Sequence, residues 1–207
     1  MKRKESLASR IVEKEWEMFR KAPSIGGPAP CQQDQLTFEM ARFSQAMSWS
    51  EICLESYLDD LVKAEGQGRN LVAEKYAHMM KATSPEDYAR IEHLLPAVDP
   101  ESLPLIDKIA DIVLAWSKEL SVKYPCLMQR GRPMSSSDAA PSETSLETYL
   151  RGELSTYSRR TLELYCENIQ QQQSENLNGA EIVLECTVKR HGYNSLADAE
   201  KQLKAKP

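Results

Sequence analysis

Arginine, lysine and tyrosine side chains gather in three short stretches of this sequence, and side chains of these types bind anions. The stretches are GRNLVAEKYA, RGRP and TYLRGELSTYSRR. Guanidinium groups hold phosphate or carboxylate oxygens through paired hydrogen bonds. The alternative is that each arginine pairs with an acidic neighbour at the surface. The cations that the first interpretation makes candidate ligand-binding residues are Arg69, Lys75, Arg130, Arg132 and Arg151.

The loop IGGPAPCQQD, residues 25–34, is a second place where chemistry is predicted. Cys31 comes just before a predicted helix, whose first amides attract an anion and favour the nucleophilic thiolate. The sequence pairs no base with this cysteine, so the alternative is a capped loop with an incidental thiol. The polar side chains expected to crowd this helix start are Gln32, Asp34, Glu39, Arg42 and Gln45.

Acidic side chains at four-residue spacing are candidate ligands for an ion, because they share one face of a helix. The pairs are Glu51 with Glu55, Glu55 with Asp59, and Glu74 with His78. Ordinary solvated helix faces are the alternative. The sequence has no Cys-x-x-Cys, no His-x-x-x-His and no glycine-rich nucleotide motif. It therefore predicts no metal site, no zinc and no nucleotide, and it leaves any other cofactor unknown.

The composition is that of an ordinary globular protein, with 41% hydrophobic and 28% charged residues. A formal net charge of -5 argues against nucleic acid as a partner. The apolar runs stay well short of the roughly 20 residues that cross a bilayer, which argues against a membrane partner. The five cysteines, an odd number, are predicted to be free thiols in the cytoplasm.

The elements that must position these side chains are predicted to be helices, because apolar residues recur at three- and four-residue steps. Capping residues and glycines mark the ends. One predicted helix begins at Thr144, either runs through or bends at Gly152, and frays at the glutamines 170–173. The predicted helical segments, caps included, are 5–21, 34–47, 50–65, 70–82, 85–94, 105–123, 144–170, 178–191 and 196–205.

These segments predict an all-α fold with one helical domain, residues 1–207, of about eight or nine helices. Residues 129–143 are predicted to form a long surface loop, and 196–205 a short C-terminal helix. The segment 105–123 carries the strongest apolar stripe, so we expect it to be the central helix with Trp116 in the core. Leu36 is expected on the apolar stripe of the second helix.

Several stretches together resemble an uncharacterised bacterial family that is catalogued only as a domain of unknown function. They are IVEKEWEMF, GGPAPCQ, GRNLVAEKYAHMM, KYPCLMQRGRP and TSLETYLRGELSTYS, and the resemblance spans roughly residues 10–198. It implies an intracellular helical protein with no established reaction. Polar residues dominate the shared stretches, which favours a ligand site over a purely structural role.

The resemblance extends the set of candidate site residues. Cys31, Glu74 and Tyr157 become candidate catalytic residues. Glu15 and Thr148 also match the family pattern. The candidate ligand-binding residues are Trp16, Gln32, Arg69, Asn70, Lys75, Tyr76, Arg130, Arg132, Tyr149, Arg151 and Glu153.

Two functions are compatible with these residues. The first is a pocket for a small anionic molecule, with or without enzymatic activity, in which Arg130, Arg132 and Arg151 converge and the opening loop forms a wall. The second is a non-catalytic adaptor whose helices bind a protein partner. Convergent Arg, Glu and Tyr side chains in a cavity favour the pocket, whereas an exposed apolar patch without a deep polar cavity favours the adaptor.

Overall fold

A computed structural model describes residues 2–24, 27, 29–135, 137 and 144–205, and most of these residues are helical. Helices account for 77% of the described residues, and no strand occurs among them, so the all-α prediction is confirmed. Three short 3-10 helices are η1 Pro30–Gln33, η2 Glu92–Leu94 and η3 Pro100–Ser102. The α-helices are α1 Lys2–Lys21, α2 Gln35–Ala46, α3 Glu51–Gly66, α4 Leu71–Thr83, α5 Pro85–Ile91, α6 Leu103–Lys123, α7 Pro125–Met128, α8 Leu146–Leu154, α9 Arg159–Ser174, α10 Gly179–Arg190 and α11 Leu196–Lys204.

The described residues form eleven α-helices, more than the eight or nine predicted. One addition is the single turn α7. The other comes from a break between α8 and α9, which the sequence predicted as one helix. Ser158 starts α9, because its hydroxyl accepts a hydrogen bond from the backbone N–H of Thr161 and its own N–H donates to the Asp60 carboxylate. These capping bonds fix a new helix start where continuous periodicity suggested none.

Gly152 lies inside α8, so of the two predicted alternatives the helix runs through this glycine. A methyl group at this position would lie 2.6 Å from Cγ of Met79 and 3.0 Å from the backbone oxygen of Lys75. The glycine therefore permits the close approach of α8 to α4. This contact brings Lys75 beside the residues that α8 turns inward.

The glutamines at 170–173 continue α9 through Ser174, so the prediction that they fray the helix is wrong. Gln172 is buried, and its Nε2 donates to the backbone oxygen of Ser48 at 2.7 Å. A buried amide with a hydrogen-bond partner stabilises the helix end that it occupies. The bond also ties α9 to the connection between α2 and α3.

The N-terminal caps predicted from the sequence are Asp34, Ser50, Ser84, Thr144, Asn178 and Ser195. Most are confirmed, but Ser84 at the start of α5 forms no side-chain capping bond. The side chains of Asp34, Ser50, Asn178 and Ser195 each accept a hydrogen bond from a backbone N–H in the first turn of α2, α3, α10 and α11. The start of α8 differs by one residue, because Ser145 caps it in place of Thr144.

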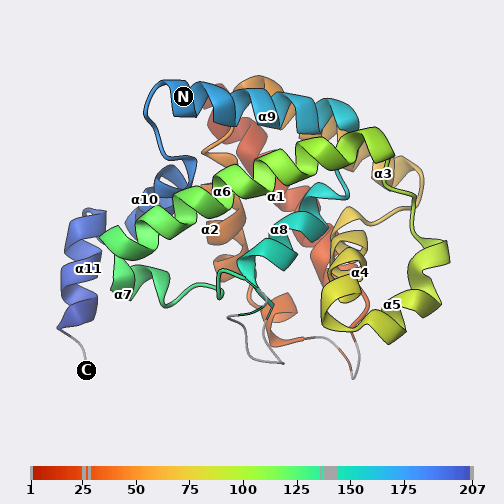
Figure 1. The fold of residues 1–207 in the computed structure, drawn as a ribbon, viewed down its shortest axis with the longest axis horizontal. Coiled ribbons are helices and arrows are strands. Elements are labelled where there is room, and N and C mark those ends of the chain that lie inside the picture. Colours follow the sequence, from red (N-terminus) through yellow and green to blue (C-terminus); the bar gives the residue numbers. More distant parts are fainter. Residues whose placement is uncertain (1, 25–26, 28, 136, 138–143, 206–207) are drawn as a thin grey trace.

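Helix α6 crosses the middle of the molecule and contacts α8, α9 and α10 (Figure 1). Helices α4 and α5 lie at the right of this view, and α7, α10 and α11 at the left. Trp116 on α6 is only 7% exposed, so the prediction that it belongs to the core is confirmed. The central helix thus extends from one end of the molecule to the other.

The C-terminal helix α11 packs on α7 through a small apolar cluster that includes Val188 and Leu196. Glu200 stabilises this contact, since its carboxylate accepts hydrogen bonds from the backbone N–H groups of Cys126 and Leu127 at 3.0 and 2.9 Å. These are the free amides at the start of α7. The larger apolar cluster extends from α1 through α3 to α9.

Helix α2 turns a charged side chain inward. Leu36 is 68% exposed, so its predicted place on a buried stripe is wrong, whereas Arg42 is buried. The physical reason is that carboxylates from two other helices, Glu15 and Glu153, bind the Arg42 guanidinium. Ion pairing can keep a buried cation charged and thereby override an apolar pattern.

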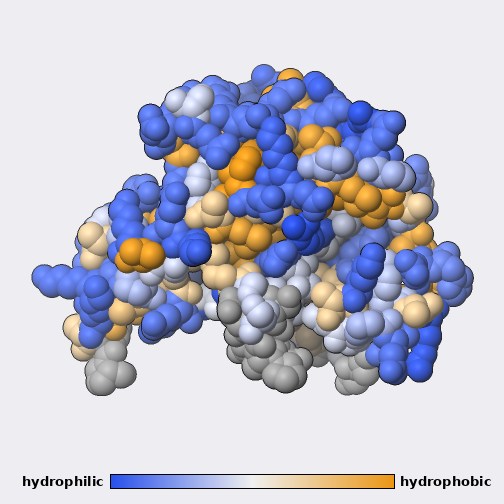
Figure 2. All heavy atoms as spheres, in the orientation of Figure 1, coloured by the Kyte–Doolittle hydropathy of each residue, from blue (hydrophilic) through white to orange (hydrophobic). Residues whose placement is uncertain are grey.

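The surface is mostly hydrophilic. In Figure 2, hydrophobic residues gather in a band below α9, across the middle of the face shown, and hydrophilic residues interrupt it. No helix in the described ranges combines the length and the apolar character needed to cross a membrane. Within the predicted surface loop 129–143, residues 136 and 138–143 lie outside the described part of the chain.

Candidate functional site

Four charged residues occupy core positions on four different helices. They are Glu15 on α1, Arg42 on α2, Lys75 on α4 and Glu153 on α8, and each is less than a tenth exposed. Buried charges are rare in proteins unless they are paired. Their placement makes this part of the molecule the first candidate for a site.

Arg42 is the centre of this charge network. Its Nε and Nη2 donate to the two carboxylate oxygens of Glu15 at 2.8 and 2.5 Å. Its Nη2 and Nη1 also donate to the two oxygens of Glu153 at 2.8 and 3.1 Å, and Nη1 donates to Oε1 of Gln45 at 2.6 Å. All five N–H donors of a guanidinium group are thereby used. Arg42 consequently has no donor left for a ligand.

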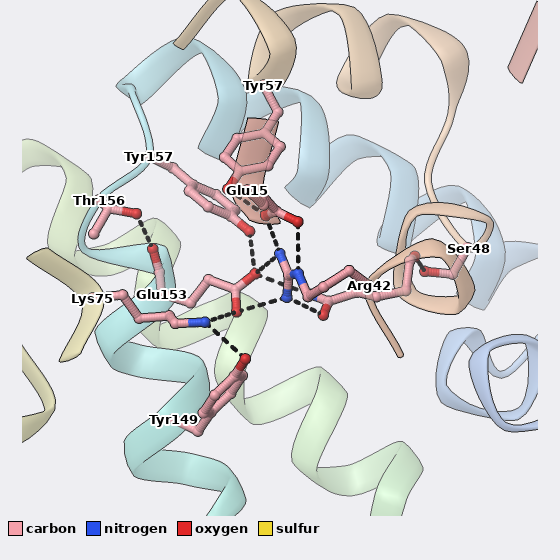
Figure 3. A network of polar contacts seen from close by, with 10 residues as sticks. Glu15, Arg42, Ser48, Tyr57, Lys75, Tyr149, Glu153, Thr156 and Tyr157 are labelled. Carbon is pink, nitrogen blue, oxygen red and sulfur yellow. Dashed lines mark hydrogen bonds and ion pairs between the residues drawn. The ribbon is translucent and has the colours of Figure 1, made fainter. Parts of the chain in front are cut away.

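Three tyrosines complete the network, as Figure 3 shows. The hydroxyl of Tyr57 donates to Glu15 at 2.7 Å, and that of Tyr157 donates to Glu153 at 2.6 Å. Lys75 Nζ donates to the hydroxyl oxygen of Tyr149 at 2.7 Å and lies 3.7 Å from a carboxylate oxygen of Glu153. The network therefore joins α1, α2, α3, α4, α8 and the start of the α8–α9 connection.

The network is balanced in charge. Burial opposes the charge of Arg42, but the two carboxylates outweigh it and raise the pKa of Arg42 well above its ordinary value. Burial also opposes the charge of Glu153, yet Arg42 and Lys75 lower its pKa to about 2. Burial, reinforced by Glu153, raises the pKa of Tyr157 far above its ordinary value. Tyr157 therefore stays protonated, and its hydroxyl acts as a hydrogen-bond donor to Glu153 and not as a base.

Acid should weaken the fold through Glu153. Its pKa of about 2 in the folded protein lies below the ordinary value of 4.5, so the carboxylate stabilises the fold above pH 4.5. That contribution, roughly 3 kcal/mol, is expected to disappear as the pH falls from about 4.5 to about 2. Urea unfolding measured between pH 7 and pH 2.5 tests this. Glu153→Gln should lower stability at pH 7 and flatten the acid limb, and an unchanged acid limb in that variant would contradict the assignment.

A cavity of about 300 Å³ borders one side of the network. It lies between α6, α9 and α10 on one side and Gly131, Arg132 and α8 on the other. Its walls are mostly apolar. Four of its polar lining side chains, Gln45, Arg132, Tyr149 and Glu153, belong to the network or contact it, and they form the polar end of the cavity. The apolar lining residues are Val113, Trp116, Leu120, Leu127, Met128, Leu146, Leu150, Ile169, Ala180, Val183 and Leu184, and the polar ones include Gln45, Ser48, Arg132, Tyr149, Glu153 and Gln172.

Arg132 lies at the polar end of this cavity. Its Cζ is 4.6 Å from the centre of the Tyr149 ring, and its Nη1 donates to the backbone oxygen of Thr144 at 3.3 Å. The neighbouring Pro133 is fixed to the start of α8, because its oxygen accepts the N–H of Leu146 at 2.7 Å. Within the described ranges, no acidic side chain forms an ion pair with Arg132, which adds one positive charge beside the balanced network.

The three arginines expected to converge do not do so. Arg151 binds Asp107 at 2.5 Å and Glu147 at 3.0 Å, on the side of α8 that faces α6. Residues two apart on a helix point in different directions, so Arg151 cannot join Tyr149 and Arg132. Arg130 is exposed and does not line the cavity. Arg132 alone of the three reaches it.

Arg69 and Glu74 form a separate pair. Arg69 donates to both carboxylate oxygens of Glu74 at 2.9 and 2.6 Å, and the two residues line a second, polar cavity of about 330 Å³. Asn70 caps α4 and also donates to the backbone oxygen of Met18 at 2.8 Å. Each of these side chains already has partners within the protein. Among the described residues, no group of His, Cys, Asp and Glu side chains is arranged to hold a metal ion.

The opening loop is hydrogen-bonded to the end of α1 through Gln32. Gln32 is buried, and its Nε2 donates to the backbone oxygens of Phe19 and Ala22 at 2.8 and 2.9 Å. Asp34 itself caps α2, which fills the place where an anion was expected. Cys31 is exposed in η1. Residues 25, 26 and 28 of this loop lie outside the described part, and none of its described residues lines the 300 Å³ cavity.

Trp16 and Tyr76 belong to an aromatic cluster around Phe19. The Trp16 ring lies 5.3 Å from that of Phe38, and the Tyr76 ring stacks on Phe19 at 6.0 Å. Neither residue lines the cavity. The structure therefore brings Lys75, Arg132, Tyr149 and Glu153 together and places the other candidate ligand-binding residues elsewhere.

Sequence reasoning missed Tyr57 and placed Arg42 and Gln45 at the wrong site. A signal for the network was present in the helical patterns. Glu15 lies four residues from both Ile11 and Phe19, and Lys75 lies four residues from both Leu71 and Met79. A charged residue inside an apolar stripe predicts a buried partner of opposite charge.

The fold and this site define an all-helical protein with a buried, charge-balanced network beside an apolar cavity. The chain belongs to the family described as "Protein of unknown function (DUF4125)", whose sequence profile matches residues 5–201. The resemblance found in the short polar stretches is thereby confirmed at the level of the family. No curated protein and no solved structure shows significant similarity to the chain.

Proposed function

We propose that this protein binds a small amphiphilic anion in the 300 Å³ cavity. The observation that carries the proposal is the combination of apolar walls with the polar end formed by Arg132, Tyr149, Glu153 and Gln45. Ligand sites are typically concave and apolar with a few polar groups that orient the ligand. A reducing compartment such as the cytoplasm is part of the proposal, because all five cysteines are free.

The walls suit an apolar ligand body of modest size. Trp116 and Ile169 offer ring and aliphatic surface on either side, and contact with such surface is favourable at about 25 cal/mol per Å² removed from water. A volume of about 300 Å³ is at the small end of the range for ligand sites, roughly 300 to 1,000 Å³. We therefore expect a short aliphatic or single-ring compound.

Charge favours an anion at the polar end. Glu15 and Glu153 balance Arg42 and Lys75, and Arg132 is a further cation with no acidic partner in the described ranges. One negative charge on the ligand would complete the balance. Guanidinium groups recognise carboxylate and phosphate oxygens with charge-assisted hydrogen bonds.

The adaptor hypothesis has less support. The hydrophobic band of Figure 2 is the observation in its favour, but hydrophilic residues interrupt it. The most exposed apolar side chains come from separate elements, such as Leu36 on α2, Leu94 in η2 and Val122 on α6. A partner surface usually requires one contiguous apolar patch.

Arg132→Ala and Arg130→Ala form a matched pair that tests the proposal. Octanoate and 4-phenylbutanoate should raise the melting temperature of the wild-type protein, with about 2.7 kcal/mol of stabilisation at 100 times the dissociation constant. Arg132→Ala should weaken binding about 10- to 100-fold, the equivalent of one charge-assisted hydrogen bond. Arg130→Ala should bind as the wild type does, because Arg130 does not line the cavity.

Isothermal titration of the three proteins gives these affinities directly. Equal weakening by both substitutions would point to a nonspecific effect of surface charge and would contradict the proposed site. The absence of binding by the wild-type protein to either compound would overturn the proposed function.

A further inference from the structure

We infer that Tyr149 selects the ligand's head group and that the preferred ligand is a monocarboxylate. This inference rests on the proposed function of the cavity. It assigns a specificity role to a hydroxyl whose hydrogen-bonding capacity is only partly used within the protein. It also narrows the ligand from anions in general to one chemical class.

Lys75 determines what Tyr149 can do. The Lys75 ammonium donates to the phenol oxygen at 2.7 Å, so this oxygen is already an acceptor. The phenol proton remains, and none of the described residues accepts a hydrogen bond from it. Tyr149 also lines the cavity. Toward a ligand it is therefore principally a donor, which requires an acceptor atom on the ligand.

The position of Tyr149 is fixed from several sides. Lys75 Nζ lies 4.3 Å and Arg132 Cζ lies 4.6 Å from the ring centre, so two cations contact its π system. Lys75 is itself held 3.7 Å from Glu153, and Figure 3 shows the tyrosine extending from α8 to meet it. A donor held in place before binding loses little conformational freedom when the ligand arrives.

The charge count separates carboxylates from phosphate esters. The network and Arg132 together carry three cations and two carboxylates, which leaves one positive charge. A carboxylate supplies one negative charge and two oxygens, one for the Tyr149 hydroxyl and one for Arg132. A phosphate monoester carries about two charges above pH 6, which exceeds the single positive charge that the network and Arg132 leave over.

Three probes with one alkyl chain test the inference at pH 8: octanoate, octanamide and octyl phosphate. The wild-type protein should bind octanoate at least about tenfold more tightly than either of the others. Tyr149→Phe keeps the ring and removes only the hydroxyl. It should weaken octanoate about tenfold and octanamide only a few-fold, because a hydrogen bond to a charged oxygen is stronger than one to a neutral carbonyl, so the ratio of the two dissociation constants should fall.

Tyr76→Phe is the matched control, since Tyr76 adjoins Lys75, with its ring centre 5.2 Å from Nζ, but does not line the cavity. It should leave the ratio unchanged. The melting temperature without ligand shows whether each variant is folded. The affinity ratio of the wild-type protein is a test that does not depend on the folding of any variant. Octyl phosphate bound as tightly as octanoate, or an unchanged ratio in Tyr149→Phe, would overturn the inference and leave the proposed function intact. Octanamide bound as tightly as octanoate would overturn both, because the proposed ligand is an anion. Failure of the wild type to bind any probe would overturn both.

Discussion

Replacing Arg42 by methionine is expected to lower the free energy of unfolding by about 3 to 5 kcal/mol. The substitution keeps an apolar stem of similar length but removes all five hydrogen bonds of the guanidinium group. Two buried carboxylates of the network, Glu15 and Glu153 (2% and 3% exposed), would then share one cation, Lys75, which lies 3.7 Å from Glu153. The loss is dominated by these stranded carboxylates, because a buried ion pair contributes little net stability beyond a well-packed apolar replacement.

Urea unfolding of this variant gives the loss, and Arg90→Met is the matched control. Arg90 pairs with Asp87 at 3.0 Å on the exposed helix α5, so its removal should change stability by less than about 1 kcal/mol. Adding Glu15→Gln to Arg42→Met should recover part of the loss, because one stranded charge disappears. Similar small effects of Arg42→Met and Arg90→Met would show that the network does not hold the helices together.

Trp116→Ala is expected to cost about 3 to 5 kcal/mol, since it removes a large, nearly buried ring from the central helix. The ring contacts the start of α10 so closely that a methyl group on Gly179 would lie 2.7 Å from its Cζ3. It also forms part of the cavity wall. The truncation should therefore enlarge the cavity and separate α6 from α10.

Val122→Ala on the same helix is the control for this prediction. Val122 is 82% exposed, so its truncation should change stability by no more than about 0.5 kcal/mol. Thermal and urea unfolding of both variants give the comparison. A loss below about 1 kcal/mol for Trp116→Ala would mean that α6 is not the central support of the fold.

The helices were predictable because their signals are local. The apolar stripe of α6, the caps at Ser50 and Asn178, and the C-terminal helix at 196–204 follow from residues a few positions apart. The break between α8 and α9 was not predictable, because it depends on Asp60, a residue 98 positions from Ser158 along the chain. Sequence periodicity contains no information about such a partner.

The site was predictable in part for the same reason. Lys75 was found through its residue type, Tyr149 and Glu153 were found through the family resemblance of short polar stretches, and the three lie together in the structure. The partnership of Arg42 with Glu153 spans 111 positions and depends on how α2 and α8 pack. Arg130, Arg132 and Arg151 are close in sequence, yet helical geometry and the acids of α6 direct Arg151 away from the others.

A crystal structure of the protein with octanoate is the most direct test of the proposed cavity site. The proposal predicts the carboxylate within about 3.2 Å of the Tyr149 hydroxyl and the Arg132 guanidinium, the usual limit of such hydrogen bonds. The alkyl chain should lie along Trp116 and Ile169. Octanoate bound only outside the cavity, or with its carboxylate among the apolar walls, would contradict the proposed site.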